Sequence, residues 1–251
     1  MTTVHPRSRP RRRSPGWVPN QHGAWAMLAA PLFVGTVASG PTWVHLPLAA
    51  FWFTGYFAFF ATGLWLKARR RDRWFPPVRV YVPAALALGL VVLAVQPELV
   101  RWAPAFVLPL GVGLVAAAQR HERDLVAGLT TVTASGLIAV VAYDAGTGPG
   151  GSLDRGWLLA AIQFAYFAGT VFYVKSAIRE RGNPGFLRLS VGVHLATTLA
   201  MGAVSPWLVG VFALLTLRAA VLPGRGLTPG RIGVIEVVAT VVVSTVSLLV
   251  V

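Results

Sequence analysis

Nine apolar segments, separated by short polar connections, determine what this chain can fold into. An α-helix needs about 20 apolar residues to cross the hydrocarbon core of a bilayer, and somewhat shorter segments are tolerated. The sequence therefore predicts an all-α membrane protein of about nine transmembrane helices, with Pro31, Pro104 and Pro109 bending two of them. The segments are residues 24–40, 47–66, 78–96, 103–118, 125–143, 157–174, 187–204, 207–222 and 232–251.

The composition agrees with a lipid environment. Of the 251 residues, 55% are hydrophobic and 12% are charged, whereas a soluble protein carries about 25% charged residues. The formal net charge of +14 does not indicate nucleic-acid binding, because the basic residues form short clusters between the apolar segments. The chain has no cysteine, which excludes disulfides and thiolate chemistry.

The distribution of lysine and arginine predicts the orientation of the chain. If the N-terminus is cytoplasmic, the cytoplasmic segments hold five, six, two, four and three of these residues, which is 20 of the 22. Only Arg101 and Arg155 then lie outside, as expected from the excess of positive charge in cytoplasmic loops. We therefore expect a multi-pass protein of the bacterial inner membrane, with its C-terminus outside. Residues 1–19 would form a disordered basic cytoplasmic tail and residues 20–251 the transmembrane domain.

Two loops share one sequence pattern. Residues 67–76 and 175–184 both fit Lys-x-x-x-Arg-acid-Arg-x-x-Pro, and each follows an aromatic-rich apolar segment. The only two lysines of the chain, Lys67 and Lys175, begin the two copies. Many transporters are built from repeated helical units with their sites between the repeats. We predict two parallel four-helix units, at about 20–124 and 125–231, followed by a last helix at 232–251.

The repeated loops supply the main candidate ligand-binding residues. Lys67 with Arg71, and Lys175 with Arg179, are four positions apart and would share a helical face, so each pair is suited to hold one anionic group. The alternative is that these are ordinary cytoplasmic loops whose common origin has left a shared pattern. Secondary candidates in the same loops are Asp72, Glu180, Arg181 and Asn183.

Four further polar residues lie at the ends of apolar segments or inside them. Gln21 and His22 open the first segment, where they either face an internal cavity or only cap the helix. His194 and Glu236 lie within predicted helices, where ionisable groups are costly and often functional. The simpler interpretation of Glu236 is a pairing with Arg231 or another cation at the cytoplasmic rim. For His194 it is a hydrogen bond between helices.

No metal site is predicted. His121 and Glu122 are adjacent, so they do not share a helical face as paired metal ligands would. The loop that contains them mixes both signs of charge and is better interpreted as a self-paired surface segment.

Two stretches resemble a known family. Asn-Gln-His-Gly-Ala-Trp-Ala-Met at 20–27 and Tyr-Val-Lys-Ser-Ala-Ile-Arg-Glu-Arg at 173–181 look like the YwiC-like family of bacterial membrane proteins. The resemblance spans essentially the whole helical region. It implies a bacterial membrane protein without an assigned biochemical role.

The architecture more distantly resembles that of the UbiA-type prenyltransferases, which share nine helices, a cytoplasmic N-terminus and matched loops after the second and sixth helices. In that family the loops carry aspartate-rich motifs that hold magnesium against a prenyl diphosphate. Here Lys67, Arg71, Lys175 and Arg179 stand where acidic ligands would be expected. The single carboxylates beside arginines are a poor basis for a magnesium site. No cofactor is therefore predicted, and magnesium-dependent prenyl transfer is not expected.

Three functions remain open from the sequence. The favoured one is a UbiA-like bundle that binds an anionic lipid or isoprenoid-phosphate headgroup in a cytoplasmic-facing cavity through direct cationic contacts. As an enzyme, it would be a lipid-modifying transferase without Asp-rich motifs. The second is a transporter for a small anion or metabolite, with His22, His194 and Glu236 along the path. The third is a non-catalytic component of a membrane complex. The expected partners are membrane lipids and a phosphate-bearing small molecule or lipid, and no nucleic acid.

Overall fold

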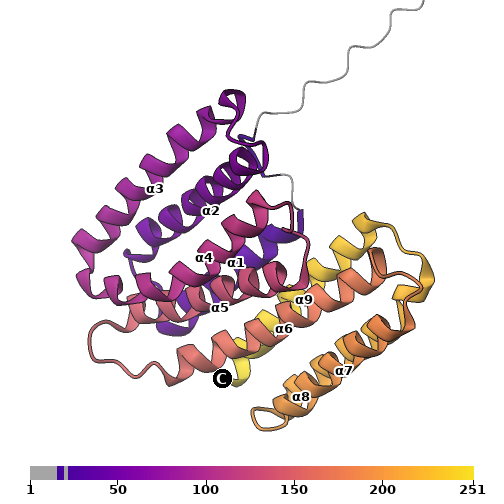
Figure 1. Ribbon diagram of the computed structural model, residues 1–251. Coiled ribbons are helices and arrows are strands. Elements are labelled where there is room, and N and C mark those ends of the chain that lie inside the picture. Colours follow the sequence, from indigo (N-terminus) through magenta and orange to yellow (C-terminus); the bar gives the residue numbers. More distant parts are fainter. Residues whose placement is uncertain (1–15, 20–21) are drawn as a thin grey trace, which may run out of the picture.

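Nine α-helices make up the fold in the computed structural model, which describes residues 16–19 and 22–251 (Figure 1). Short 3₁₀ helices lie in three of the connections, and the described residues contain no strand. The helices are α1 (His22–Ser39), α2 (His45–Lys67), η1 (Asp72–Trp74), α3 (Pro76–Val95), η2 (Pro97–Trp102), α4 (Ala103–Ala118), α5 (Leu125–Thr147), α6 (Asp154–Ile178), α7 (Pro184–Met201), α8 (Pro206–Val221), η3 (Pro223–Arg225) and α9 (Pro229–Val250). The all-α prediction is confirmed, and each predicted segment corresponds to one α-helix.

Six of these helical segments are long and apolar enough to cross a bilayer. They are α2, α3, α5, α6, α9 and residues Pro97–Ala118, which combine η2 with α4. α1 and α8 are apolar but shorter, and α7 carries Arg188 and His194 within its 18 residues. The outer surface is apolar too, since Leu90, Val107, Leu199 and Leu249 are between 69% and 79% exposed. Such a surface is suited to lipid rather than water. The chain is a multi-pass membrane protein.

The prolines of the two matched loops set where the next helices begin. Pro76 is the first residue of α3 and Pro184 the first residue of α7. Proline is favoured in the first turn because the N–H that it lacks would have no intrahelical partner there. Asn183 caps α7 by accepting hydrogen bonds from the N–H groups of Gly185 and Phe186, each at 3.1 Å. The first matched loop is therefore limited to the residues between the end of α2 and Pro76, and the second to those between the end of α6 and Pro184.

Helices α1 and α5 cross at small residues near the centre of the molecule. A Cβ atom on Gly35 would lie 2.1 Å from the carbonyl oxygen of Ala139, so the two backbones are in direct contact there. The hydroxyl of Ser135 donates to the carbonyl oxygen of Met27 in α1. Close approach through small residues and hydrogen bonds between helices are how membrane helices associate without a hydrophobic driving force. Residues 138–145 of α5 are all buried, which makes this helix part of the core.

The remaining helices form two groups on either side of α1 and α5 (Figure 1). In the first group α3 and α4 each pack on α2, and η2 joins them. In the second group α7 packs on both α6 and α8, while α9 contacts α1, α6 and α8. The helices of the first predicted repeat unit therefore do not all make the same contacts as the corresponding helices of the second. The two-repeat organisation stays a prediction.

Candidate functional site

Four basic loops lie at one end of the bundle and contact one another. Lys67, the last residue of α2, forms an ion pair with Glu122 in the α4–α5 loop. Arg179, after α6, donates to the carbonyl oxygen of Arg123 in that same loop at 3.2 Å. Arg181 donates to the carbonyl oxygen of Leu227 in the α8–α9 loop at 3.2 Å. The loops after α2, α4, α6 and α8 therefore form one surface, which we call the basic face.

The two arginines that the charge distribution placed outside bind acceptors near the ends of α1 and α5. Arg155 donates to the carbonyl oxygen of Ala38, close to the end of α1, at 3.1 Å. Arg101 forms a 2.5 Å ion pair with Asp144, close to the end of α5. Asp144 is 3% exposed and also accepts a hydrogen bond from Trp102 Nε1 at 2.7 Å. The end of α5 is opposite to its start, which follows the basic-face loop between α4 and α5.

The first matched loop does not continue the turn of α2. Arg69 and Arg70 have φ angles of +56° and +57°, in the left-handed region that few residues other than glycine adopt. The helix therefore ends at Lys67, and the chain changes direction before it reaches Arg71. Lys67 and Arg71 do not share a helical turn, which corrects the expectation from their spacing. Arg71 and Asp72 are both exposed, and Asp72 begins η1.

The second matched loop has the expected geometry. Lys175 lies in the last turn of α6, and the N–H of Arg179 donates to its carbonyl oxygen at 2.9 Å. Lys175 Nζ lies 5.8 Å from the centre of the Phe186 ring in α7. No carboxylate pairs with this ammonium group within residues 16–19 and 22–251. Glu180 instead accepts a hydrogen bond from Asn183 Nδ2 at 3.0 Å.

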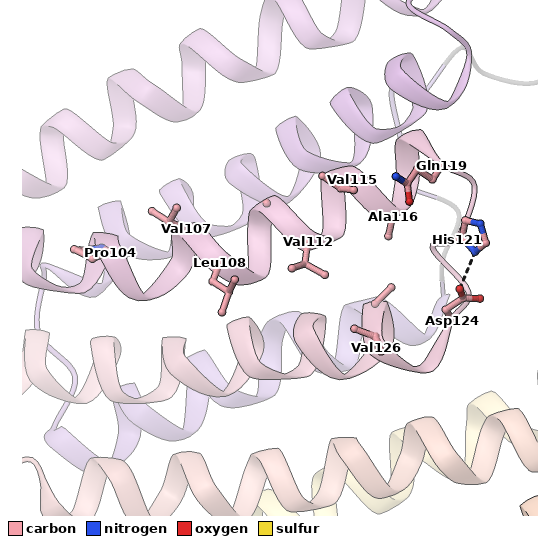
Figure 2. Close-up of a pocket in the computed structure, with 12 residues that line it drawn as sticks. Pro104, Val107, Leu108, Val112, Val115, Ala116, Gln119, His121, Asp124 and Val126 are labelled. Carbon is pink, nitrogen blue, oxygen red and sulfur yellow. Dashed lines mark hydrogen bonds and ion pairs between the residues drawn. The ribbon is translucent and has the colours of Figure 1, made fainter.

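The α4–α5 loop separates the two matched turns. Lys67 pairs with Glu122 of that loop and Arg179 with the carbonyl oxygen of Arg123, whereas no hydrogen bond or ion pair joins the two turns directly within the described residues. An apolar surface groove of about 770 Å³ lies between α4 and the start of α5. Its polar end is the 2.8 Å contact between His121 Nδ1 and Asp124 Oδ2 (Figure 2). Neither lysine lines this groove.

The remaining candidates from the start of the chain are not placed. Gln21 lies outside the described residues. His22 begins α1, but only its backbone is described. Their role at the entrance of the first helix stays a prediction.

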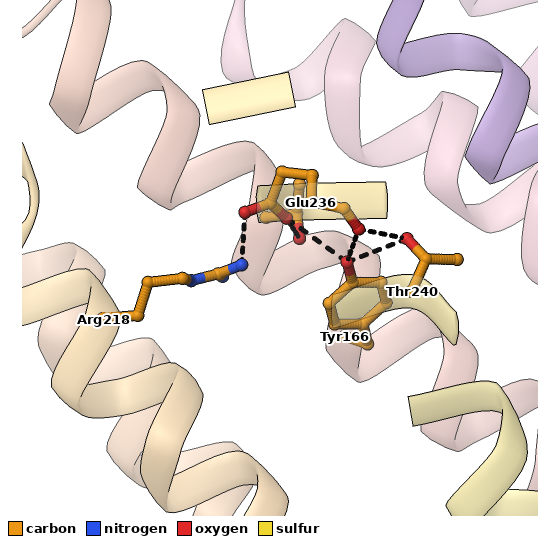
Figure 3. A network of polar contacts seen from close by, with 5 residues as sticks. Tyr166, Arg218, Glu236 and Thr240 are labelled. Atoms are coloured by element: carbon orange, nitrogen blue, oxygen red, sulfur yellow. Dashed lines mark hydrogen bonds and ion pairs between the residues drawn. The ribbon is translucent and has the colours of Figure 1, made fainter. Parts of the chain in front are cut away.

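A buried polar network lies in the second group of helices (Figure 3). Glu236 of α9 forms an ion pair with Arg218 of α8. The other carboxylate oxygen of Glu236 accepts a hydrogen bond from Thr170 of α6 at 2.7 Å. The Tyr166 hydroxyl lies 3.0 Å from the carbonyl oxygen of Glu236 and 2.9 Å from Thr240 Oγ1. The Tyr166 hydroxyl also lies 3.3 Å from the carboxylate, which is therefore bound by side chains of two other helices, α6 and α8.

The sequence predicted a cation as the partner of Glu236, but it did not single out Arg218 and placed the pair at the cytoplasmic rim. The side chains of Arg218 and Glu236 are 8% and 11% exposed, so the pair is buried in the bundle and does not involve Arg231 at the rim. Arg218 was counted among the cytoplasmic cations because it lies near the end of its apolar segment. The available signal was that each of the two opposite charges lies four residues inside its predicted apolar segment, 207–222 for Arg218 and 232–251 for Glu236. A buried ion pair must be well hydrogen-bonded to be tolerated.

His194 of α7 is buried, and its side chain makes no hydrogen bond to another helix among the described residues. Its Nδ1 lies 2.8 Å from the carbonyl oxygen of Ser190, one turn earlier in the same helix. Because a carbonyl oxygen only accepts, Nδ1 carries the proton, and Nε2 of the neutral ring is an acceptor. The prediction of a hydrogen bond between helices is therefore wrong, since Nδ1 donates to the backbone of α7 itself.

Comparison with known proteins decides the family. The family model described as YwiC-like protein matches residues 18–143, about half of the chain. This chain belongs to the YwiC-like family. The Uncharacterized protein YwiC of Bacillus subtilis (strain 168) is 31% identical over 225 residues, which are 88% of this chain and 92% of that protein.

A second relative extends over a similar length. An uncharacterized protein of Haemophilus influenzae (strain ATCC 51907 / DSM 11121 / KW20 / Rd) is 26% identical over 230 residues, which are 90% of this chain and 94% of that protein. The resemblance to the YwiC-like family found in the sequence is therefore confirmed. No solved structure matches the chain significantly. The architectural resemblance to UbiA-type prenyltransferases stays a prediction.

Proposed function

We propose that this YwiC-like protein lies in the bacterial inner membrane with its basic face toward the cytoplasm and binds an anionic headgroup there. The ligand is an anionic lipid or an isoprenoid phosphate. One observation carries the proposal: contacts among the loops after α2, α4, α6 and α8 gather the basic residues of these loops at one end of the bundle. Anionic lipids of the cytoplasmic leaflet attract such residues by about 1 kcal/mol for each Lys or Arg near the surface.

Within the basic face, Lys175 and Arg179 are the best candidates for direct contact with the headgroup. They lie one helical turn apart at the end of α6, and Arg179 is exposed. A phosphate between them would receive charge-assisted hydrogen bonds from both side chains. Lys67 has a different role in this proposal, because its ion pair with Glu122 orders the neighbouring α4–α5 loop.

The two lysines offer a matched test of headgroup binding. The full-length protein and its Lys175→Gln and Lys67→Gln variants are reconstituted in vesicles of phosphatidylcholine with phosphatidylglycerol, and the phosphatidylglycerol retained per protein after mild extraction is measured by mass spectrometry. Lys175→Gln is expected to lower retention about fivefold, the equivalent of about 1 kcal/mol. Lys67→Gln is expected to retain nearly as much lipid as the wild type. Equal retention by Lys175→Gln and the wild type would refute the proposal.

Transport of a small anion is a second candidate, favoured by the buried pair of Arg218 and Glu236. Charged residues at membrane depth commonly mark substrate or ion paths. Uptake of labelled phosphate and of small carboxylates into vesicles that contain the purified protein tests this function. Uptake that depends on Arg218 would support transport, and no uptake of any anion in the panel would count against it.

A further inference from the structure

The guanidinium group of Arg218 uses only one of its two binding edges. Nη1 donates to Glu236, whereas Nε and Nη2 are buried and have no hydrogen-bond acceptor among the described residues. Nε–H and Nη2–H lie on the same edge of the planar group and point in the same direction. This fork matches two oxygens of a phosphate or carboxylate. Buried donors without an acceptor are destabilising, and the cost is greater for a charged group.

Tyr173 of α6 holds this guanidinium from one side and adds another donor. Arg218 Cζ lies 4.3 Å from the centre of the Tyr173 ring, so the charged group lies over the aromatic face. Tyr173 is fully buried, and its hydroxyl has no partner within the described part of the chain. The ring packs against the plane of the guanidinium, and the buried hydroxyl keeps an unused donor.

Helix α7 adds an acceptor and a hydroxyl one turn away. A Cβ atom on Gly169, four residues before Tyr173, would lie 3.1 Å from His194 Nε2, so the ring packs directly on α6. His194 Nε2 and the hydroxyl of Ser190 are buried and have no partner in the described segments. Residues four apart share a helix face, which holds for Gly169 with Tyr173 and for Ser190 with His194. The unpaired groups of α6, α7 and α8 therefore lie close together.

We propose that these groups form a binding site for a phosphate group inside the bundle, between α6, α7 and α8. The free edge of Arg218 holds two phosphate oxygens, and the Tyr173 hydroxyl donates to the ligand. His194 Nε2 accepts a hydrogen bond from the P–OH group that a phosphate monoanion carries. A carboxylate offers the two oxygens but no such donor, so phosphate or a phosphate monoester fits the combined set better.

The site lies near the basic face but uses none of the residues proposed for headgroup binding there. Arg218 is three residues before the last residue of α8, which is about 5 Å along the helix axis. Lys175 is two residues beyond Tyr173 on α6, toward the same face. The positive charge of that face would concentrate anions at the entrance. The buried phosphate site and the headgroup site are thus two independent proposals.

The variant Arg218→Lys tests the site without removing the charge opposite Glu236. Lysine keeps the positive charge but lacks the planar fork. Equilibrium binding of radiolabelled inorganic phosphate is measured on the full-length protein in detergent. The wild type is expected to bind saturably, and Arg218→Lys is expected to bind at least about tenfold more weakly. Arg188→Lys, which changes an exposed arginine of α7, is the matched control and is expected to bind like the wild type.

A double variant separates loss of the site from loss of the fold. Arg218→Met combined with Glu236→Met replaces the ion pair by apolar side chains of similar length, a change that buried pairs often tolerate. It is expected to unfold at a temperature close to that of the wild type and to bind no phosphate. Saturable binding by this variant, wild-type affinity in Arg218→Lys, or no saturable binding of inorganic phosphate or short-chain phosphatidic acid to the wild type would each overturn the inference.

Competition identifies the source of the phosphate group. Displacement of labelled phosphate by dioctanoyl phosphatidic acid assigns the site to a lipid headgroup, whereas displacement by glycerol phosphate alone assigns it to a free phosphate ester. The two proposals also fail separately. If Lys175→Gln retains phosphatidylglycerol but Arg218→Lys loses phosphate, only headgroup binding at the basic face is refuted.

Discussion

The only two lysines of the chain begin matching loops, yet their surroundings differ. Lys67 is paired with Glu122, whereas Lys175 lies near the Phe186 ring without a carboxylate partner in the described part of the chain. The difference comes from a third loop, between α4 and α5, that is not part of the shared pattern. Sequence reasoning treated the two positions as equivalent because a motif records the residues of its own loop and not those of the loop beside it.

The pair of Lys67 and Glu122 makes stability depend on pH. Burial by itself raises the pKa of Glu122, but the hydrogen bond from Lys67, a backbone hydrogen bond and the charges of Lys67 and Arg123 together hold this pKa below its ordinary value of 4.5. Because the pKa of Glu122 is lower in the folded than in the unfolded protein, the ion pair stabilises the fold fully at pH values above the ordinary pKa. Its contribution is lost as the pH falls through the lowered pKa.

Thermal unfolding of the wild type and Glu122→Gln in detergent checks this dependence. At pH 7 the wild type is expected to be more stable by less than about 1 kcal/mol, since both side chains are partly exposed. At acidic pH below the lowered pKa the two proteins are expected to unfold at the same temperature. A difference that stays constant from neutral to acidic pH would contradict the role of this ion pair.

Among the helices, the boundaries were largely predictable and the turns were not. The apolar segments anticipated nine helices because hydropathy reports directly on burial in lipid. Helix α6 extends beyond the predicted 157–174 to Asp154–Ile178, because its polar ends remain helical past the apolar stretch. The turn after α2 could not be predicted, since Arg69 and Arg70 adopt a left-handed backbone although neither is a glycine.

The crossing of α1 and α5 is tested by one added methyl group. In Gly35→Ala the new Cβ would lie 2.1 Å from the backbone oxygen of Ala139, which cannot rotate away, so the helices must separate. We expect the free energy of unfolding to fall by roughly 1–3 kcal/mol, which is typical of overpacking. Gly111→Ala in α4 is the control, because its Cβ would meet nothing within 4 Å and alanine improves helix propensity by about 1 kcal/mol.

Thermal unfolding in detergent measures both glycine variants. Gly35→Ala is expected to unfold at a lower temperature than the wild type, and Gly111→Ala at the same or a higher temperature. Similar shifts in the two variants would mean that the close contact between α1 and α5 does not contribute to stability.

At the scale of the whole molecule, the proposed orientation can be tested directly because the chain has no cysteine of its own. Gln119→Cys places a thiol beside the α4–α5 loop, and Ser152→Cys places one in the α5–α6 loop; both positions are exposed. A membrane-impermeant maleimide is expected to label Ser152→Cys in intact cells, and Gln119→Cys only after permeabilisation. The opposite pattern would reverse the orientation.

The alternation of charge predicted which loops share one end of the bundle, but it did not reveal the buried network. The loops that share one end of the bundle can be predicted by counting charged residues along the chain. The pairing of Arg218 with Glu236 depends instead on how α8 and α9 face each other. Hydropathy also assigned Arg218 to the membrane surface, because an arginine near a helix end normally reaches the interface. Its burial follows from the carboxylate opposite.

Helices α7 and α8 form a hairpin whose attachment to the rest of the molecule has a consequence for motion. Two of its neighbours are α6 and α9, and the contact with α9 includes the ion pair between Arg218 and Glu236. Neutralising Glu236 would therefore loosen two helices together rather than one.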